Sequence, residues 1–136
     1  MRALVDTDIL LDIALNREPF VRESAEVIRW AQSEPGQMGI AWHSLSNVAY
    51  LVESARDFIH DILHFIEVAP AGTREAKHAL GFPMRDLEDA LQAASAVAFD
   101  AMFIVTRNSK DYKKSPIRAI TPSKFLAEVG RSRTIS

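Results

Sequence analysis

The chain has 136 residues, of which 48% are hydrophobic and 25% are charged, and its formal net charge at pH 7 is −2. This composition fits one globular domain, 1–136, and the absence of any run of about 18 apolar residues argues against a membrane span. Cysteine is absent, which excludes disulfide and thiolate chemistry, and no signal-peptide pattern opens the chain, so we expect a cytoplasmic protein.

The spacing of apolar residues predicts strands that alternate with helices along the whole chain. In chain order, we expect a strand at 2–6, helices at 8–15 and 20–32, a strand at 38–42, a helix capped by Ser44 or Ser46 and ending near Val52, a helix from Phe58 to Ile66, a short strand and turn at 67–72, helices at 73–80 and 86–99, strands at 101–106 and 117–121, and a helix that begins at Pro122. This alternation predicts an α/β domain with a mainly parallel sheet.

The charges are distributed unevenly along the chain. Residues 1–100 carry 8 Lys/Arg and 16 Asp/Glu, a net charge of −8, whereas residues 101–136 carry 8 Lys/Arg and 2 Asp/Glu, a net charge of +6. A basic segment beside an acidic body can attract phosphates to a carboxylate site. The alternative interpretation is a solvated basic tail.

The stretch ALVDTDILLD places three carboxylates directly after the first predicted strand. Asp6 ends that strand, and Asp8 and Asp12 follow within seven residues. Like charges this close are tolerated if they are solvated, if their proton affinities rise, or if a cation joins them. Taken singly, Asp8 is best interpreted as a helix N-cap and Asp12 as a solvated residue.

Oxygen-bearing side chains from distant segments are expected to meet at one edge of the sheet. Asp6 ends the first strand, Asn108 and Asp111 follow the strand at 101–106, and Asp86 and Asp89 lie one turn apart on the helix before it. In open parallel sheets, ligands bind beyond the carboxyl ends of the strands. An oxygen-rich cluster without cysteine suits Mg²⁺ or Mn²⁺, which can activate water for attack on a phosphodiester. Asp86 can alternatively serve only as a helix cap.

The segments LVDTDILLD, DLEDALQAASA and FIVTRNSKDY, in this order and spacing, resemble the PIN-domain family, which includes the VapC toxins of bacterial toxin–antitoxin pairs. The resemblance extends from Leu4 to the helix at 121–126. It implies a three-layer α/β/α domain with a metal-dependent ribonuclease site, and a possible antitoxin partner. We also expect a homodimer.

The resemblance also implies roles for particular residues. Asp6, Asp89 and Asp111 match the catalytic, metal-binding acids, and Thr7 and Thr106 match hydroxyls that lie beside them. The family's usual glutamate after the second strand is here Asn47, and the first acid of its TRDxDF segment is here Asn108, a potential metal ligand. Both amides keep an oxygen but lose a charge, which weakens the expected site, and Asp86 is expected to compensate in part.

Four basic residues surround Asp111 in the polar loop after the strand at 101–106. We expect them to hold the phosphates of RNA; they are Arg107, Lys110, Lys113 and Lys114. The alternative is a soluble turn.

Other functions fit the sequence less well. DTDIL matches the paired aspartates of haloacid dehalogenase phosphatases, but no paired acidic motif completes that site late in the chain. His60 and His64 have the spacing of zinc ligands on a helix, yet they lack the H-E-x-x-H glutamate and are expected to be exposed. A PIN-like module that has lost catalysis and binds RNA or a protein remains open, because Asn47 and Asn108 replace acids. Trp30 and Trp42 are expected in the core, although Trp42 could stack on a base.

Overall fold

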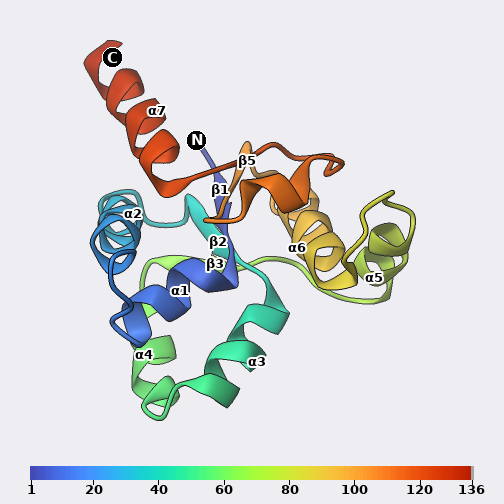
Figure 1. Ribbon diagram of the computed structural model, residues 1–136, viewed down its shortest axis with the longest axis horizontal. Helices are drawn as coiled ribbons and strands as arrows, with labels where there is room; N and C mark the ends of the chain where they lie inside the picture. The colour runs from blue at the N-terminus through green and yellow to red at the C-terminus, as the bar shows by residue number, and fades with distance from the viewer. Residues whose placement is uncertain (136) are drawn as a thin grey trace.

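The computed structural model describes residues 1–135, and the side chains of residues 1–130, as one α/β domain (Figure 1). Its elements, in chain order, are β1 Ala3–Val5, α1 Thr7–Ala14, α2 Val21–Ser33, β2 Met38–Ile40, α3 Trp42–Leu51, α4 Ala55–Ile62, β3 Ile66–Val68, α5 Thr73–Leu80, α6 Leu87–Ala98, β4 Phe103–Val105, the 3₁₀ turn η1 Ser109–Tyr112, β5 Ala119–Ile120 and α7 Pro122–Ile135. Every predicted strand and helix is present in these residues. The largest shifts are at α3, which begins at Trp42, and at α4, which ends four residues earlier than expected.

The strands form one five-stranded sheet in this part of the chain, in the order β3-β2-β1-β4-β5, and all its pairs are parallel. The prediction of a mainly parallel sheet is therefore confirmed. The central strand β1 lies between β2 and β4, so the chain leaves it in one direction and later returns on its other side. The strand order reverses between β1 and β4, and the carboxyl ends of strands at such a reversal are the usual ligand position in parallel sheets.

Helices cover both faces of the sheet and give the expected three layers (Figure 1). On one face, Val5, Met38 and Ile40 pack with buried residues of α1, α2, α3, α4 and α7. On the other face, Leu4 and Ile104 pack against α6 and the residues that follow it. Adjacent strand residues thus face opposite layers, as the two-residue period of a strand requires.

Small residues bring α6 close to its neighbours. Ala90 and Ala94 of α6 pack with Ala79 of α5. On β2, a Cβ at Gly39 would lie 2.8 Å from the ring of Phe99, so only glycine leaves room for this ring against the strand. The alanine contacts hold the first half of α6, which carries Asp89, against α5, and the Phe99 contact holds the end of α6 against the sheet.

The two tryptophans lie in different environments. Trp30 is 8% exposed, and its ring meets Phe125 edge to face at 5.0 Å, which confirms the prediction that it is a core residue. Trp42 is 65% exposed, so its assignment to the core was wrong. The reason is that Trp42 begins α3 instead of ending β2, which turns its side chain out of the sheet's alternation. Within the described residues, no helix has the length and apolar character needed to cross a membrane.

Candidate functional site

Asp6 ends β1 and is the N-cap of α1. Its Oδ1 accepts a hydrogen bond of 2.7 Å from the backbone N–H of Thr7. Its Oδ2 accepts from the hydroxyls of Thr106 (2.9 Å) and Tyr112 (3.0 Å). Burial raises the pKa of Asp6 even though these three hydrogen bonds act to lower it. The interpretation of Asp8 as the N-cap was therefore wrong, because the helix begins earlier than expected, at Thr7.

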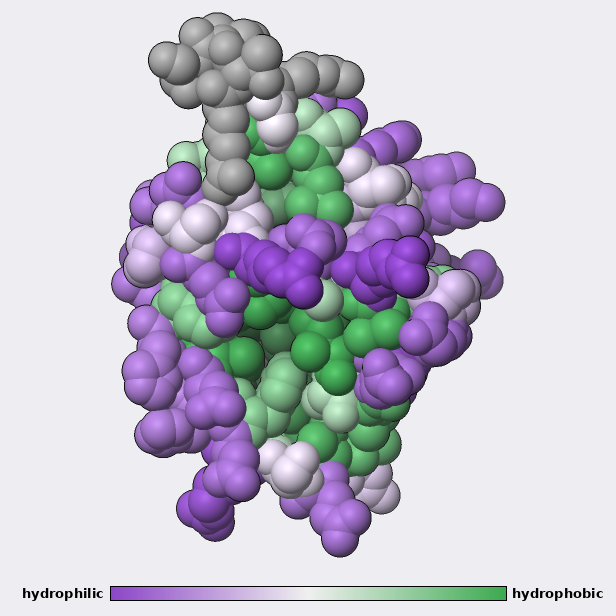
Figure 2. Space-filling view, turned by 90° about the vertical axis from the view of Figure 1, so that its left-hand side faces the viewer, coloured by the Kyte–Doolittle hydropathy of each residue, from purple (hydrophilic) through white to green (hydrophobic). Residues whose placement is uncertain are grey.

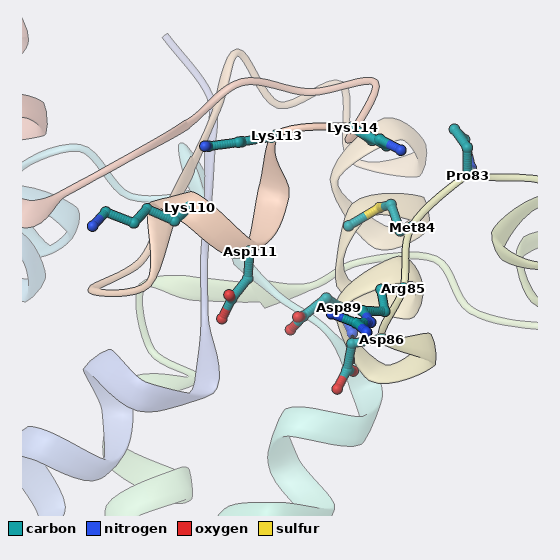
Figure 3. Close-up of a pocket in the computed structure, with 9 residues that line it drawn as sticks. All are labelled: Pro83, Met84, Arg85, Asp86, Asp89, Lys110, Asp111, Lys113 and Lys114. Atoms are coloured by element: carbon teal, nitrogen blue, oxygen red, sulfur yellow. Dashed lines mark hydrogen bonds between the residues drawn. The ribbon is translucent and has the colours of Figure 1, made fainter.

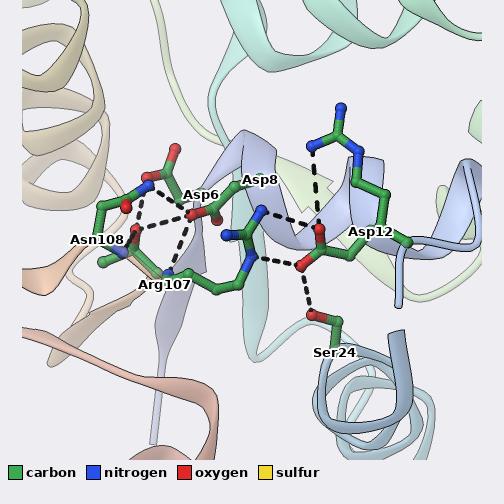
Figure 4. Close-up of polar contacts among 8 residues, drawn as sticks. Asp6, Asp8, Asp12, Ser24, Arg107 and Asn108 are labelled. Atoms are coloured by element: carbon green, nitrogen blue, oxygen red, sulfur yellow. Dashed lines mark hydrogen bonds and ion pairs between the residues drawn. The ribbon is translucent and has the colours of Figure 1, made fainter. Parts of the chain in front are cut away.

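Asp8 instead faces the loop that follows β4 (Figure 4). Its Oδ2 accepts from the backbone N–H of Arg107 (3.0 Å), from Asn108 Nδ2 (3.2 Å) and, at 3.3 Å, from Thr106 Oγ1. Its Oδ1 is buried and has no hydrogen-bond partner among the described residues. Burial, followed by the charge of Asp6, raises the pKa of Asp8 to about 6.

Asp12 is completely buried, so the prediction that it is solvated was wrong. Both its oxygens accept from Arg107, at 2.8 Å from Nε and 3.0 Å from Nη2, and Ser24 Oγ donates to it at 3.1 Å (Figure 4). Arg17 completes the surroundings at 4.0 Å. The Arg107 guanidinium also lies 3.9 Å from the centre of the Phe20 ring. The charge of Asp12 is thus matched inside the protein, which removes the need for solvation.

A cleft of about 530 Å³ lies between η1 and the start of α6. It is lined by Pro83, Met84, Arg85, Asp86, Asp89, Lys110, Asp111, Lys113 and Lys114 (Figure 3). Asp89 and Asp111 project toward each other from these two elements, and Asp86 lies below Asp89. Burial and the charges of Asp86, Asp6 and Asp111 raise the pKa of Asp89 to about 6. The acids of the cleft and Asp6 therefore share one electrostatic environment.

Asp86 is also the N-cap of α6, because its Oδ1 accepts from the backbone N–H of Asp89 at 3.0 Å. The cap interpretation made from the sequence is confirmed. The cap holds the first turn of α6 in the orientation that brings Asp89 over the cleft.

A buried polar network connects α1, α3 and α6 beneath these acids. The hydroxyls of Thr7 and Ser44 are 2.7 Å apart, and Gln92 Nε2 donates to both, at 3.1 and 2.9 Å. Thr7 therefore lies beside Asp6, as the resemblance implied, but its hydroxyl turns toward the helices. Nearby, Asn47 Nδ2 donates to Glu88 Oε1 at 3.1 Å and joins α3 to α6.

The predicted site residues form two adjoining groups. Asp6, Thr106 and Asn108 cluster at the end of β1 and β4, whereas Asp86, Asp89, Asp111 and three lysines line the cleft. Tyr112 joins the groups, since it follows Asp111 and donates to Asp6. Arg107 is drawn away from the cleft by Asp12.

Four contributors to the site were missed from the sequence. Tyr112, Glu88 and Arg85 are neighbours in sequence of acids that were identified, whereas Gln92 carried no local signal. His60 and His64 are both exposed, as expected.

The oxygen donors at this edge of the sheet meet the needs of a divalent cation only in part. Within residues 1–130, no group of three or more His, Cys, Asp or Glu side chains is already gathered closely enough to hold a metal ion. The carboxylates nevertheless crowd one another, and Asp8 Oδ1 is buried without a partner among the described residues. Mg²⁺ commonly takes one or two carboxylates and completes its shell with water and phosphate oxygens. The residues fit an open site of that kind.

Comparisons with known proteins agree with this architecture. Residues 2–110 match the sequence profile of the PIN domain. No curated protein matches the chain. Among solved structures, the chain is similar to a toxin–antitoxin complex from Klebsiella pneumoniae, with a TM-score of 0.65, 22% identity, and coverage of 88% of this chain and 97% of that chain.

Two further structures are similar at lower identity. VapBC2 from Rickettsia felis, bound to a DNA fragment from its promoter, gives a TM-score of 0.65 at 17% identity, covering 89% of this chain and 98% of that one. DNA-bound VapBC from Salmonella typhimurium gives a TM-score of 0.60 at 19% identity, and the match covers 90% of this chain and 98% of that one.

The fold is a three-layer α/β domain with acidic side chains beyond the carboxyl ends of its parallel strands. It belongs to the class of open α/β proteins in which ligands bind where the order of the strands reverses. The profile match covers most of the chain, and the protein belongs to the PIN domain family.

Proposed function

We propose that this protein is a metal-dependent endoribonuclease that acts as the toxin of a toxin–antitoxin pair. The single observation that carries the proposal is the pairing of Asp89 with Asp111 across a cleft that is also lined by lysines of the Asp111 segment. Acids alone would repel a nucleic acid, and lysines alone would bind it without a means of cleavage. Their combination supports phosphodiester chemistry.

The proposed catalytic acids are Asp6, Asp89 and Asp111. A bound Mg²⁺ or Mn²⁺ would polarise the phosphodiester and make water a better nucleophile. Asp6 is held by Thr7, Thr106 and Tyr112, so its carboxylate has a fixed orientation. Asp89 and Asp111 contribute negative charge from the two sides of the cleft, and Asn108, whose amide nitrogen donates to Asp8 Oδ2, is the proposed amide ligand.

Phosphate binding is assigned to the lysines of the cleft, Lys110, Lys113 and Lys114. Arg85 lines the same cleft from the segment before α6 and joins this set. Arg107, which the sequence suggested for this role, is left out because its guanidinium is hydrogen-bonded to Asp12. The basic groups thus come from both sides of the acids, an arrangement that suits a backbone passing over the carboxylates.

Cleavage of a single-stranded RNA by the purified protein tests this function. We expect cleavage with Mn²⁺, none with excess EDTA, and a loss of at least about a hundredfold in Asp89→Asn. Asp57→Asn, on the exposed surface of α4, removes the same charge away from the site and is expected to cleave like wild type. Equal cleavage by wild type and Asp89→Asn would exclude the assigned site.

The alternative function is a PIN-like module with weakened catalysis that binds RNA or a protein. Asn47 and Asn108 favour it, because each replaces an acid that the family resemblance implies. RNA binding without cleavage, unchanged by Mn²⁺, would support this alternative.

An antitoxin is the protein partner that fits the proposal, because the similar structure from Klebsiella pneumoniae is named as a toxin–antitoxin complex. The side of the molecule around α2 and α4 exposes apolar side chains between hydrophilic margins (Figure 2). Exposed apolar surface of this kind is typical of protein interfaces. Co-purification with the product of a small neighbouring reading frame, and relief of toxicity by it, would test the partner. The homodimer remains a prediction, for which sedimentation is the measurement.

A further inference from the structure

Glu88 is an acid at the start of α6 that does not line the cleft. It occupies the first turn of α6, next to Asp89, and its Oε1 accepts from Asn47 Nδ2 of α3 at 3.1 Å. The charge of Glu88 acts on Asp6, where it contributes to the raised pKa, and on His43 of α3, where it opposes the lowering of the pKa by burial. The hydrogen bond to Asn47 therefore holds the Glu88 carboxylate on the α3 side of α6, whereas Asp89 faces Asp111 across the cleft.

Asn47 has a definite hydrogen-bonding role in this arrangement. Its amide nitrogen donates to Glu88, so the contact orients a carboxylate on another helix. The resemblance placed Asn47 where an acid is expected, and by itself the amide means a missing negative charge. The contact with Glu88 indicates that a charge is present on this side, but that it is carried by α6.

The helix dipole alone does not account for Glu88. Acids are stabilised in the first turn of a helix, and Asp89 in the same turn benefits equally. The dipole does not explain why this side chain reaches across to α3 and is held there by an amide. A single exposed hydrogen bond of this type stabilises the fold only slightly.

We infer that Glu88 is the carboxylate that faces Asp6 from the α3 side of the metal site, and that Asn47 is the positioning residue that holds it there. This inference rests on the proposed function, because it concerns the same site. In this inference, Glu88 of α6 supplies the negative charge that Asn47 of α3 lacks, whereas the charge lost at Asn108 is not replaced by Glu88.

Two variants of this pair should behave differently. Asn47→Glu alone replaces an amide–carboxylate hydrogen bond by two facing carboxylates, so it should not improve the site by itself. The exchange variant Asn47→Glu/Glu88→Gln returns the pair to one carboxylate and one amide, with the charge now on α3. The exchange variant should therefore bind Mn²⁺ well, whereas a variant that only removes the Glu88 charge should bind it weakly.

Titration of the full-length protein with MnCl₂, followed by the paramagnetic resonance signal of free Mn²⁺, measures affinity without reference to activity. We expect Glu88→Gln to bind Mn²⁺ about tenfold more weakly than wild type, and Asn47→Leu to weaken binding in the same direction. The exchange variant should return to within about threefold of wild type. Glu53→Gln, exposed just after α3, removes the same charge and should bind like wild type.

The binding experiment distinguishes a wrong assignment of Glu88 from a wrong assignment of the whole metal site. If Glu88→Gln binds Mn²⁺ like wild type while Asp89→Asn loses binding, the inference about Glu88 is overturned and the proposed metal site stands. If wild type and Asp89→Asn both show no binding, the proposed metal site fails and the role of Glu88 fails with it. Circular dichroism of each variant establishes that a loss of binding is not a loss of fold.

Discussion

Arg107 donates two hydrogen bonds to the fully buried carboxylate of Asp12, at 2.8 and 3.0 Å, and its backbone N–H donates to Asp8. One residue of the loop after β4 therefore holds two carboxylates of α1. Because η1 continues from this loop, the contact also fixes the position of Asp111 relative to Asp6.

Removal of Arg107 should destabilise the fold more than it weakens RNA binding. Arg107→Ala leaves Asp12 buried without its main partner, and loss of one member of a buried ion pair costs about 3–5 kcal/mol. Urea unfolding followed by circular dichroism measures this change, with the exposed Lys124→Ala as the control. A loss below about 1 kcal/mol together with a clear fall in RNA affinity would return Arg107 to the phosphate-binding set.

The free energy of unfolding should fall as the pH rises through the acidic range. Asp8 and Asp89 have pKa values raised to about 6, above their ordinary value of 3.8, so between these values the folded state binds more protons than the unfolded state. Their contribution to stability is therefore present at low pH and is lost as the pH rises through about 6.

Asp89→Asn isolates one part of this pH dependence. In metal-free buffer, the variant should melt at a higher temperature than wild type at about pH 7, and the difference should shrink toward about pH 4, where the wild-type carboxyl is protonated. Thermal melts across this range measure it, with Asp57→Asn as the matched control. A difference that is constant with pH would mean that the Asp89 carboxylate is not destabilised in the folded protein.

RNA affinity should depend on the lysines of the cleft and on salt. Replacement of Lys110, Lys113 and Lys114 by Ala should weaken RNA binding. It should also reduce the slope of log affinity against log salt concentration by about 0.7 for each phosphate that the variant no longer neutralises. Binding of a single-stranded RNA by fluorescence anisotropy at several salt concentrations measures both effects. A control triple variant, Arg22→Ala/Arg56→Ala/Lys124→Ala, removes equal charge from exposed positions elsewhere. If both triple variants show the same fall in affinity, the cleft has no special role.

Asn108→Asp should lower the stability of the metal-free protein and raise its affinity for Mn²⁺. Asn108 Nδ2 donates to Asp8 Oδ2, and an aspartate there replaces this attraction by repulsion between carboxylates. We expect a lower melting temperature without metal and a larger increase with Mn²⁺ than in wild type. Asn108→Ala removes the hydrogen bond without adding charge, so it should lower stability without the gain from Mn²⁺. An equal response of both variants to Mn²⁺ would place residue 108 outside the site.

The local sequence determined the secondary-structure elements and the positions of several acids on them. Period-two and helical apolar patterns are local, so the strands and helices could be predicted, and with them the positions of Asp6 after a strand, of Asp89 in a first helical turn and of Asp111 in the loop after β4. The cap at Asp86 was equally visible, because capping depends on residues within one turn.

The partners of the charged side chains were decided by the tertiary structure. Asp12 appeared solvated because Arg107, its partner, lies 95 residues away. The hydrogen bond between Glu88 of α6 and Asn47 of α3 could not be predicted from the sequence, because the two residues lie on different helices. The same holds for the hydrogen bond from Tyr112 to Asp6, which forms only when η1 packs beside the end of β1. Sequence patterns report which residues lie on a buried face, whereas the pairing of charges depends on contacts that form only when distant segments pack together.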